Sequence, residues 1–217
     1  AIEVHNLGLL RIVQELRPDL PIHLGVFGNL YTDETARVLK GWGVQRVFPN
    51  AELSLEEVLY IRDHAAIQVI VPVHGKIPLV ISASCFVTEY AKVVPTHCEE
   101  TCAKGHWLTH EDWQMKNIGR ANLSGKDLCL LEYLDLLVKQ GLETFYIHTL
   151  GEDAAYVKAV GGIYREALQR AAAGEEFCRP EWMEHLRSLA GPGLCNGYYF
   201  GMSGQDYVQR ELALQGS

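Results

Sequence analysis

Short apolar runs alternate with amphipathic segments along most of this chain, and this alternation constrains its fold more than any other feature. Apolar runs of four to eight residues are typical of buried strands, and apolar residues at helical spacing are typical of helices. When both alternate with short connections, they predict parallel strand–helix–strand units. We expect strands at 1–4, 22–27, 44–48, 66–73 and 144–148, and helices at 7–17, 32–42, 54–64, 125–141, 152–174 and near 180–190.

Capping residues mark several of the expected helix ends. Thr32 precedes two acidic residues, which a helix N-terminus favours. Ser54 is followed three residues later by Glu57, the pattern of a capping box. Gly141 and Gly174 stand where two helices are expected to end.

Five parallel strands are compatible with an open doubly wound sheet, whereas a closed barrel needs about eight. No Gly-x-Gly-x-x-Gly pattern follows any expected strand, which removes the main dinucleotide-binding interpretation. We expect residues 1–174 to form an α/β domain with a cysteine-bearing insertion at about 75–122. Residues 175–217 are expected to form a C-terminal tail that packs on this domain.

The composition restricts the cellular setting. The 217 residues are 48% hydrophobic and carry a formal net charge of −8, so a globular fold is expected and nucleic acid is disfavoured as a partner. No apolar run approaches the roughly 20 residues of a membrane span. The first residues lack the basic and apolar regions of a signal peptide. We therefore expect a cytoplasmic protein with no membrane span.

Polar residues follow the expected strands, at the edge where catalytic groups gather in parallel α/β folds. They are His5, Asn6, Asn29, Asn50, Glu52, His74 and His148, with Gly28 and Gly75 beside two of them. We predict that His5, Asn29, Glu52, His74 and His148 face one common cavity. The alternative is that such residues only cap solvated strand ends, and for His148 a structural role is an equal alternative.

Cys85, Cys98 and Cys102 form a Cys-x12-Cys-x3-Cys pattern that matches neither a zinc ribbon nor a ferredoxin run. A Cys-x3-Cys step places two thiols on one face of a helical turn, and thiolates are the usual ligands of iron–sulfur clusters. Buried free cysteines are the alternative, which suits Cys129 on an apolar segment. It suits Cys98 and Cys102 poorly, because their neighbours are polar: Thr96, His97, Glu99, Glu100 and Thr101. We predict that the three thiols converge on one metal centre, with Cys178 outside it.

Four segments in order resemble the peptidase U-32 (collagenase-like peptidase) family over residues 1 to about 205. They are "NAELSLEEVLYIRD", "VPVHGKIPLVISASCF", "LSGKDLCLLEYLDLLVKQGLETFYIH" and "EDAAYVKAVGGIYREAL". Within the family, the cysteine spacing and "LCNGYYFG" are most similar to the iron–sulfur branch of ubiquinone biosynthesis, in its smaller partner subunit. The "NRGxCxQxC" pattern of the RNA-modifying branches is absent.

This resemblance implies a TIM-barrel-like fold, of which the chain shows five of eight strand–helix units, with the N-terminal units missing. It implies a 4Fe-4S cluster on Cys85, Cys98 and Cys102. In the ubiquinone branch the fourth ligand lies in the missing part, and Cys195 or Cys129 is the possible substitute here. The implied activity is oxygen-independent hydroxylation of a small aromatic substrate, with prephenate as oxygen donor and a homologous partner subunit in a heterodimer.

The catalytic candidates at the implied barrel mouth are His5, Glu52, His74 and His148. Two other functions remain open. One is a hydrolase, as the family label says, although Gly-x-Ser-x-Gly and His-Glu-x-x-His motifs are absent. The other is a non-catalytic scaffold subunit that carries the cluster.

Overall fold

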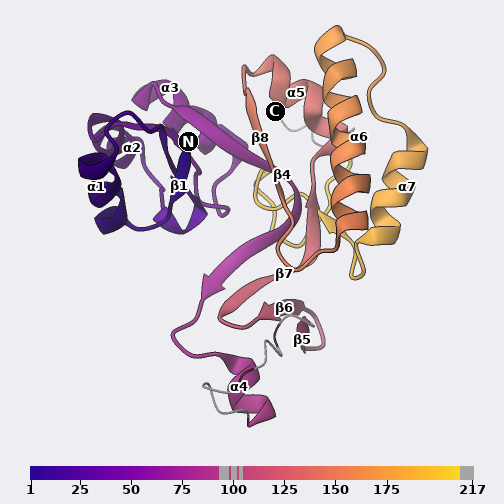
Figure 1. Ribbon diagram of the computed structural model, residues 1–217. Coiled ribbons are helices and arrows are strands. Elements are labelled where there is room, and N and C mark those ends of the chain that lie inside the picture. Colours follow the sequence, from indigo (N-terminus) through magenta and orange to yellow (C-terminus); the bar gives the residue numbers. More distant parts are fainter. Residues whose placement is uncertain (93–97, 99–101, 103–104, 211–217) are drawn as a thin grey trace.

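The computed structural model describes residues 1–92, 98, 102 and 105–210. In this part of the chain one mixed sheet carries nine strands, with helices packed around it (Figure 1). The strands are β1 (Ile2–Val4), β2 (Ile22–Leu24), β3 (Val44–Val47), β4 (Gln68–Ile81), β5 (His106–Thr109), β6 (Gln114–Ile118), β7 (Ala121–Cys129), β8 (Thr144–His148) and β9 (Leu194–Cys195). The helices are α1 (Leu7–Leu16), α2 (Asp33–Gly41), α3 (Leu55–Ala65), α4 (Phe86–Ala91), α5 (Leu134–Lys139), α6 (Ala154–Ala173) and α7 (Pro180–Leu189), with short 3-10 helices η1 (Val26–Gly28) and η4 (Leu131–Tyr133).

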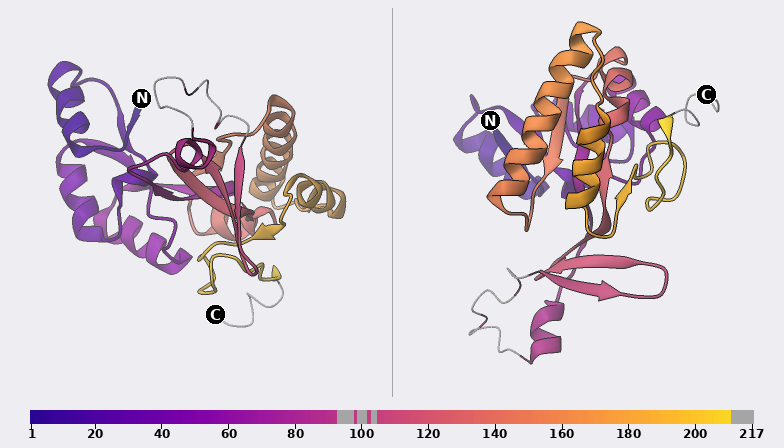
Figure 2. Two further views of the ribbon diagram at one scale, coloured as in Figure 1. Left: turned by 90° about the horizontal axis from the view of Figure 1, so that it is seen from below. Right: turned by 90° about the vertical axis from the view of Figure 1, so that its right-hand side faces the viewer.

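The parallel part of the sheet contains all five expected strands. β1, β2, β3 and β4 lie side by side in chain order, and β8 pairs with β4 in parallel. Residues such as Leu24, Val47 and Val71 are fully buried in the core against the helices. Figure 2 shows α1, α2 and α3 toward one end of the curled sheet, and α6 and α7 toward the other. The result is a curled half-barrel in which β4 also enters an antiparallel part.

β4 is the element that joins the two parts. Its first half pairs with β3 and β8, and its second half pairs antiparallel with β7 from His74 opposite Cys129 to Ile81 opposite Ala121. β5, β6 and β7 then form antiparallel pairs that project away from the main body with α4 (Figure 1). We call this projection the ribbon lobe: the outer half of β4, α4, β5, β6 and the first half of β7. The described residues of the expected insertion at 75–122 therefore include one α-helix and all or part of four strands.

The expected helix at 125–141 is wrong in its first half. Residues 121–129 form strand β7, and the α-helix begins only at Leu134. Leu128, Cys129, Leu130 and Leu131 are all buried, so the apolar run carries no period that separates a helix from a strand buried on both faces. The segment forms a strand and not a helix because β7 pairs with β4 and β9.

Helix ends follow the local signals closely. The Thr32 side chain accepts a hydrogen bond from the Thr35 N–H at 3.2 Å. The Ser54 hydroxyl accepts from the Glu57 N–H, and the Glu57 carboxylate accepts from the Ser54 N–H, which completes the predicted capping box. Gly174 closes α6 with a φ of 72°, in the left-handed region that glycine adopts without strain.

The tail beyond α6 contributes to the core. α7 matches the helix expected near 180–190, and Leu194, Cys195 and Tyr199 belong to the main buried cluster. β9 pairs with β7 through Leu128 and Cys195. Within the described residues, no helix combines the length and the apolar character that crossing a membrane requires.

Candidate functional site

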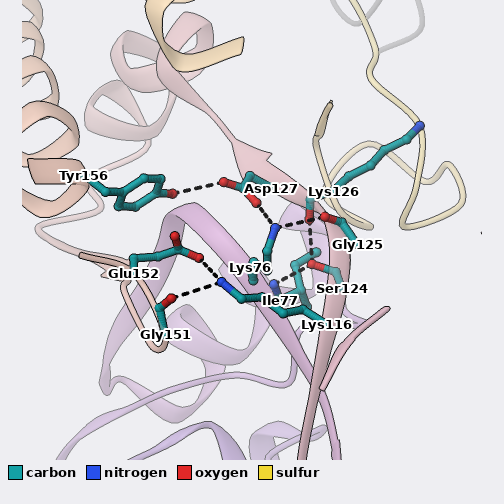
Figure 3. A network of polar contacts seen from close by, with 10 residues as sticks. All are labelled: Lys76, Ile77, Lys116, Ser124, Gly125, Lys126, Asp127, Gly151, Glu152 and Tyr156. Carbon is teal, nitrogen blue, oxygen red and sulfur yellow. Dashed lines mark hydrogen bonds and ion pairs between the residues drawn. The ribbon is translucent and has the colours of Figure 1, made fainter. Parts of the chain in front are cut away.

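A buried polar network joins β4, β7 and α6 at the base of the ribbon lobe (Figure 3). Lys76 and Asp127 are register partners on β4 and β7, and their side chains, 6% and 3% exposed, form an ion pair. The Lys76 Nζ also donates to the Gly125 carbonyl at 2.9 Å. The second Asp127 oxygen accepts from the Tyr156 hydroxyl at 3.0 Å. Both charges are therefore hydrogen-bonded, which offsets the cost of burying them.

A second polar cluster fixes the ribbon lobe to the main body. Lys116 of β6 donates to Glu152 Oε1 at 2.7 Å and to the Gly151 carbonyl at 3.1 Å, just before α6. The Ser124 hydroxyl accepts from the Ile77 N–H at 2.8 Å and donates to the Lys126 carbonyl at 2.6 Å (Figure 3). Lys116 therefore joins the ribbon lobe to the segment just before α6, and Ser124 joins β7 to β4.

His74 is a neutral buried histidine whose tautomer follows from its contacts. The Tyr164 hydroxyl donates to the Val73 carbonyl at 2.8 Å, and His74 Nδ1 lies 3.2 Å from the same hydroxyl. Because the hydroxyl has one proton, His74 Nδ1 carries the hydrogen and donates it. Burial lowers the pKa of His74 to about 4, although the nearby Asp127 carboxylate acts in the opposite direction. Its Nε2 has no partner in the described part of the chain.

His148 and His74 border a common cavity of about 20 Å³, which is large enough for one water molecule. Their imidazoles nevertheless have different neighbours. His74 packs against Tyr156 and Tyr164 of α6, whereas the ring of His148 lies 6.1 Å from that of Tyr146 on its own strand. Burial lowers the pKa of His148, and its Nδ1 also lacks a partner among the described residues.

The other three predicted site residues make separate local contacts. His5 Nδ1 accepts from the Phe27 N–H at 3.4 Å, and its Nε2 lies 3.2 Å from the Glu3 carboxylate. Asn29 follows η1 in a left-handed conformation with a φ of 53°. Glu52 accepts from the Tyr31 hydroxyl at 2.8 Å. None of His5, Asn29 and Glu52 borders the cavity of His74 and His148. The prediction that all five face one common cavity is therefore wrong for these three residues, and only His74 and His148 share a cavity. A catalytic role for His5, Glu52, His74 and His148 stays a prediction.

The three predicted cluster ligands belong to the ribbon lobe. Cys85 is the residue directly before α4, and Cys98 and Cys102 lie on the connection between α4 and β5, all three half-buried. A Cβ atom on Gly119, between β6 and β7, would lie 3.4 Å from the Cys102 Sγ. The polar neighbours at 96, 97 and 99–101 lie outside the described residues. Among the residues that are described, no three His, Cys, Asp or Glu side chains form a group that could hold a metal, so this ligand set stays a prediction.

The remaining cysteines lie in the main body. Cys129 and Cys195, the two substitutes considered for a fourth ligand, are fully buried in β7 and β9. Burial raises the pKa of the Cys129 thiol to about 11 and also raises that of Cys195. Cys178 lies between α6 and α7, where burial raises its pKa to about 12. A thiol with a raised pKa is a poor metal ligand, because the thiolate is the ligating form.

Sequence reasoning missed an aromatic groove of about 630 Å³ on the ribbon lobe. Three exposed aromatic residues contribute to it, two from α4 and one from β5. The lining residues are Phe86, Val87, Glu89, Tyr90, His106, Trp107, Leu108 and Asn117. The polar, aromatic run after the cysteines, "AKGHWLTHEDWQ", was the available signal. Its strand pairing, which the run does not reveal, places Trp107 against the groove.

Comparison with known proteins places the chain among its relatives. An uncharacterized protease of Methanocaldococcus jannaschii is 27% identical over 92% of this chain and 51% of its own length. The tRNA hydroxylation protein P of Escherichia coli is 24% identical over 97% of this chain and 57% of its own length. A collagenase of Porphyromonas gingivalis is 22% identical over 63% of this chain and 39% of its own length.

The chain spans about half the length of the first two of these relatives. No solved structure matches it. The model of peptidase family U32 matches residues 1–209, nearly the whole chain. The chain therefore belongs to peptidase family U32.

Proposed function

We propose that this chain is an iron–sulfur protein that takes part in oxygen-independent hydroxylation of a small aromatic substrate. Cys85, Cys98 and Cys102 are the proposed ligands of a 4Fe-4S cluster. The observation that carries the proposal is that Cys85 and Cys102 both belong to the ribbon lobe, where Cys85 directly precedes Phe86 of the aromatic groove and Cys102 lies next to Gly119. Membership of family U32 and the names of several relatives, which are tRNA hydroxylation proteins, support the hydroxylation part.

The finer parts of the proposal rest on the family resemblance. They are a role in ubiquinone biosynthesis in the cytoplasm, and a homologous partner subunit in a heterodimer. We also propose that the five parallel strands belong to a TIM-like barrel, which further strand–helix units or the partner complete. The fourth cluster ligand then comes from outside the described residues, because Cys129 and Cys195 are buried with raised thiol pKa values.

The test begins with protein purified and reconstituted with iron and sulfide under argon. An iron–sulfur cluster gives a broad absorption shoulder near roughly 400 nm, from sulfur-to-iron charge transfer. The triple variant Cys85→Ala, Cys98→Ala, Cys102→Ala is expected to lose most bound iron, and the control Cys178→Ala is expected to keep it. A triple variant that binds as much iron as the unmodified chain would exclude these ligands.

Hydroxylation of an RNA base is a second candidate, because relatives are named for tRNA hydroxylation and one is a 23S rRNA 5-hydroxycytidine synthase. The net charge of −8 opposes contact with a phosphate backbone. Binding of tRNA that falls steeply with added salt would favour this candidate. Its absence, with retained binding of small aromatic compounds, would favour the first.

A hydrolase remains the third candidate, because the family label and the collagenase relative name that activity. Zinc in place of iron on the three cysteines, together with cleavage of a collagen-derived peptide, would support it. A non-catalytic scaffold subunit is tested by mixing this chain with its partner. A scaffold is expected to bind the cluster, and neither chain alone is expected to hydroxylate the substrate. The mixture is expected to hydroxylate it even when the candidate site residues are intact only in the partner.

A further inference from the structure

The ribbon lobe shares little of the main hydrophobic core. The core cluster contains Ile77 of β4 and Leu128 of β7, and no described residue between these two positions belongs to it. Val87 and Leu123 are buried but lie outside this cluster. The large apolar residues that the lobe exposes are Leu79, Val80, Ile81, Phe86, Tyr90, Trp107 and Trp113. Units that are not joined by a large apolar interface move relative to one another by default. The orientation of the lobe therefore depends on the few contacts at its base.

The ladder between β4 and β7 is interrupted at this base. Beyond the buried ion pair that joins the two strands, the next register pair is Pro78 with Leu123, so three residues of β7 lie opposite Ile77 alone. The Ile77 N–H donates to the Ser124 hydroxyl, and Pro78 has no N–H to donate. A bulge of this kind bends its strand and disrupts the regular pairing. The lobe can therefore bend at the bulge with few ladder bonds to break.

Lys116 of β6 connects the lobe to the segment between β8 and α6 (Figure 3). Its Nζ donates to the Gly151 carbonyl at 3.1 Å and to Glu152 Oε1 at 2.7 Å. Gly151 has a φ of 76°, and a Cβ atom there would overlap the Ile118 Cδ1, so β6 packs directly on this segment. The side chains of Lys116 and Glu152 are 12% and 19% exposed, so salt screens the pair only in part. Lys116 pairs with Leu123 of β7, which places this contact on the lobe side of the bulge.

We infer that the ribbon lobe is an arm hinged at the β7 bulge, and that Lys116 is the latch that holds this arm against the main body. Lys116 is thus a positioning residue. It sets where the arm, which carries Cys85 and Cys102, stands relative to His148 at the end of β8, three residues before Gly151. The inference goes beyond the proposed function and does not depend on a bound cluster.

Distances between two spin labels test the inference on the full chain. Non-natural amino acids carry the labels, so the six native cysteines stay in place. One label replaces Glu111 in the turn between β5 and β6, and the other replaces the exposed Arg165 of α6. Double electron–electron resonance is expected to show one dominant distance. Lys116→Glu sets two carboxylates against each other and is expected to raise the population of other distances about fivefold.

A charge reversal separates the latch from a merely structural role. Adding Glu152→Lys to Lys116→Glu restores an ion pair of opposite polarity and is expected to return the distances toward those of the unmodified chain. Lys116→Met removes the cation without adding a like charge. It is expected to give a smaller change in the same direction, and it replaces Lys116→Glu if that variant does not fold. Arg11→Glu, at the exposed ion pair of Arg11 and Glu15 on α1, is the control and is expected to change nothing.

Unchanged distances in both Lys116 variants would show that this residue is not a latch. A broader distribution that Glu152→Lys does not reverse, or an equal broadening by Arg11→Glu, would also overturn the inference. All samples are prepared without iron, so the result is independent of whether Cys85 and Cys102 bind a cluster.

Discussion

Among single residues, Lys76 and Asp127 form the most deeply buried ion pair in the described structure, and it is expected to behave as a coupled unit. Lys76→Met or Asp127→Leu alone leaves one charge buried without its counterion, which is expected to cost about 3–5 kcal/mol in the free energy of unfolding. The double variant removes both charges and is expected to lose less than the sum of the two. Urea denaturation of the four proteins measures the coupling.

Lys116→Met is the matched control for that cycle. Lys116 pairs with Glu152, but these side chains are 12% and 19% exposed, so the remaining charge is partly hydrated. We expect a loss of about 1 kcal/mol. Strictly additive losses in the Lys76 and Asp127 cycle would show that the pair contributes no coupling.

His74 predicts a loss of stability in acid. Its pKa of about 4 in the folded protein lies below the value of roughly 6.5 expected in the unfolded chain. As the pH falls below about 6.5, the unfolded chain binds the proton first, so the free energy of unfolding decreases until about pH 4 and then levels off. The full contribution, about 3 kcal/mol, is present above pH 6.5. His74→Leu is expected to flatten this pH dependence, as followed by urea denaturation from pH 7 to pH 4.

The control is His64→Leu, because His64 is exposed in α3 and stacks on Tyr60. It is expected to leave the acid-dependent loss in place. NMR of the His74 ring is expected to show the Nδ1–H tautomer at neutral pH, as its hydrogen bond to Tyr164 requires. An Nε2–H tautomer would contradict the assignment.

At the level of elements, the capping box of α3 predicts a stability loss of known size. Ser54→Ala removes the acceptor for the Glu57 N–H and is expected to lower the free energy of unfolding by about 1 kcal/mol. Ser54→Asp keeps an acceptor and is expected to restore most of it. Ser188→Ala is the control, since its hydroxyl only donates to the His185 carbonyl in the last turn of α7. Thermal unfolding followed by circular dichroism compares the three.

Local signals of this kind explain which elements could be predicted from sequence. Thr32, Ser54 and Gly174 act within one turn of their own helix, and the strands of the parallel part are short apolar runs. β7 could not be predicted in this way. β7 lies between β4 and β9 in the sheet. Its Asp127 pairs with Lys76 of β4 and with Leu194 of β9, and both partners are far away in the chain. The apolar run of β7 fits a helix and a buried strand equally well, so the long-range pairing decides between them.

The candidate site is likewise predictable only where its residues follow local signals in the sequence. The cysteine spacing and the strand-end histidines are visible in the sequence, yet their positions relative to one another depend on the path of the chain. His74 turns toward α6, where it meets Tyr164, 90 positions later. The aromatic groove depends on the placement of α4 beside β5, which brings Phe86, Tyr90 and Trp107 together. This placement cannot be seen in the sequence.

At the level of the whole molecule, the half-barrel has two open edges within the described chain, β1 and β8. β1 pairs only with β2, and β8 only with β4. The Ile2 N–H donates to the Pro21 carbonyl, and the Val4 carbonyl accepts from the Gly25 N–H, so these residues face β2. In a parallel ladder the residue between them, Glu3, then directs its N–H and C=O away from the sheet. Free groups of this kind can pair with another chain.

We therefore expect this chain to associate through its edges, with a mass that rises with concentration in size-exclusion chromatography with light scattering. Glu3→Pro removes the outward N–H at the β1 edge without removing a bond to β2, and is expected to reduce association. Glu3→Ala is its control, because both variants remove the carboxylate that contacts His5 but only the proline removes the donor. A chain that stays monomeric at all concentrations, with a cooperative thermal transition, would show that the two edges need no partner strand. Equal association of Glu3→Pro and Glu3→Ala would instead place the contact elsewhere, with β8 as the next edge to test.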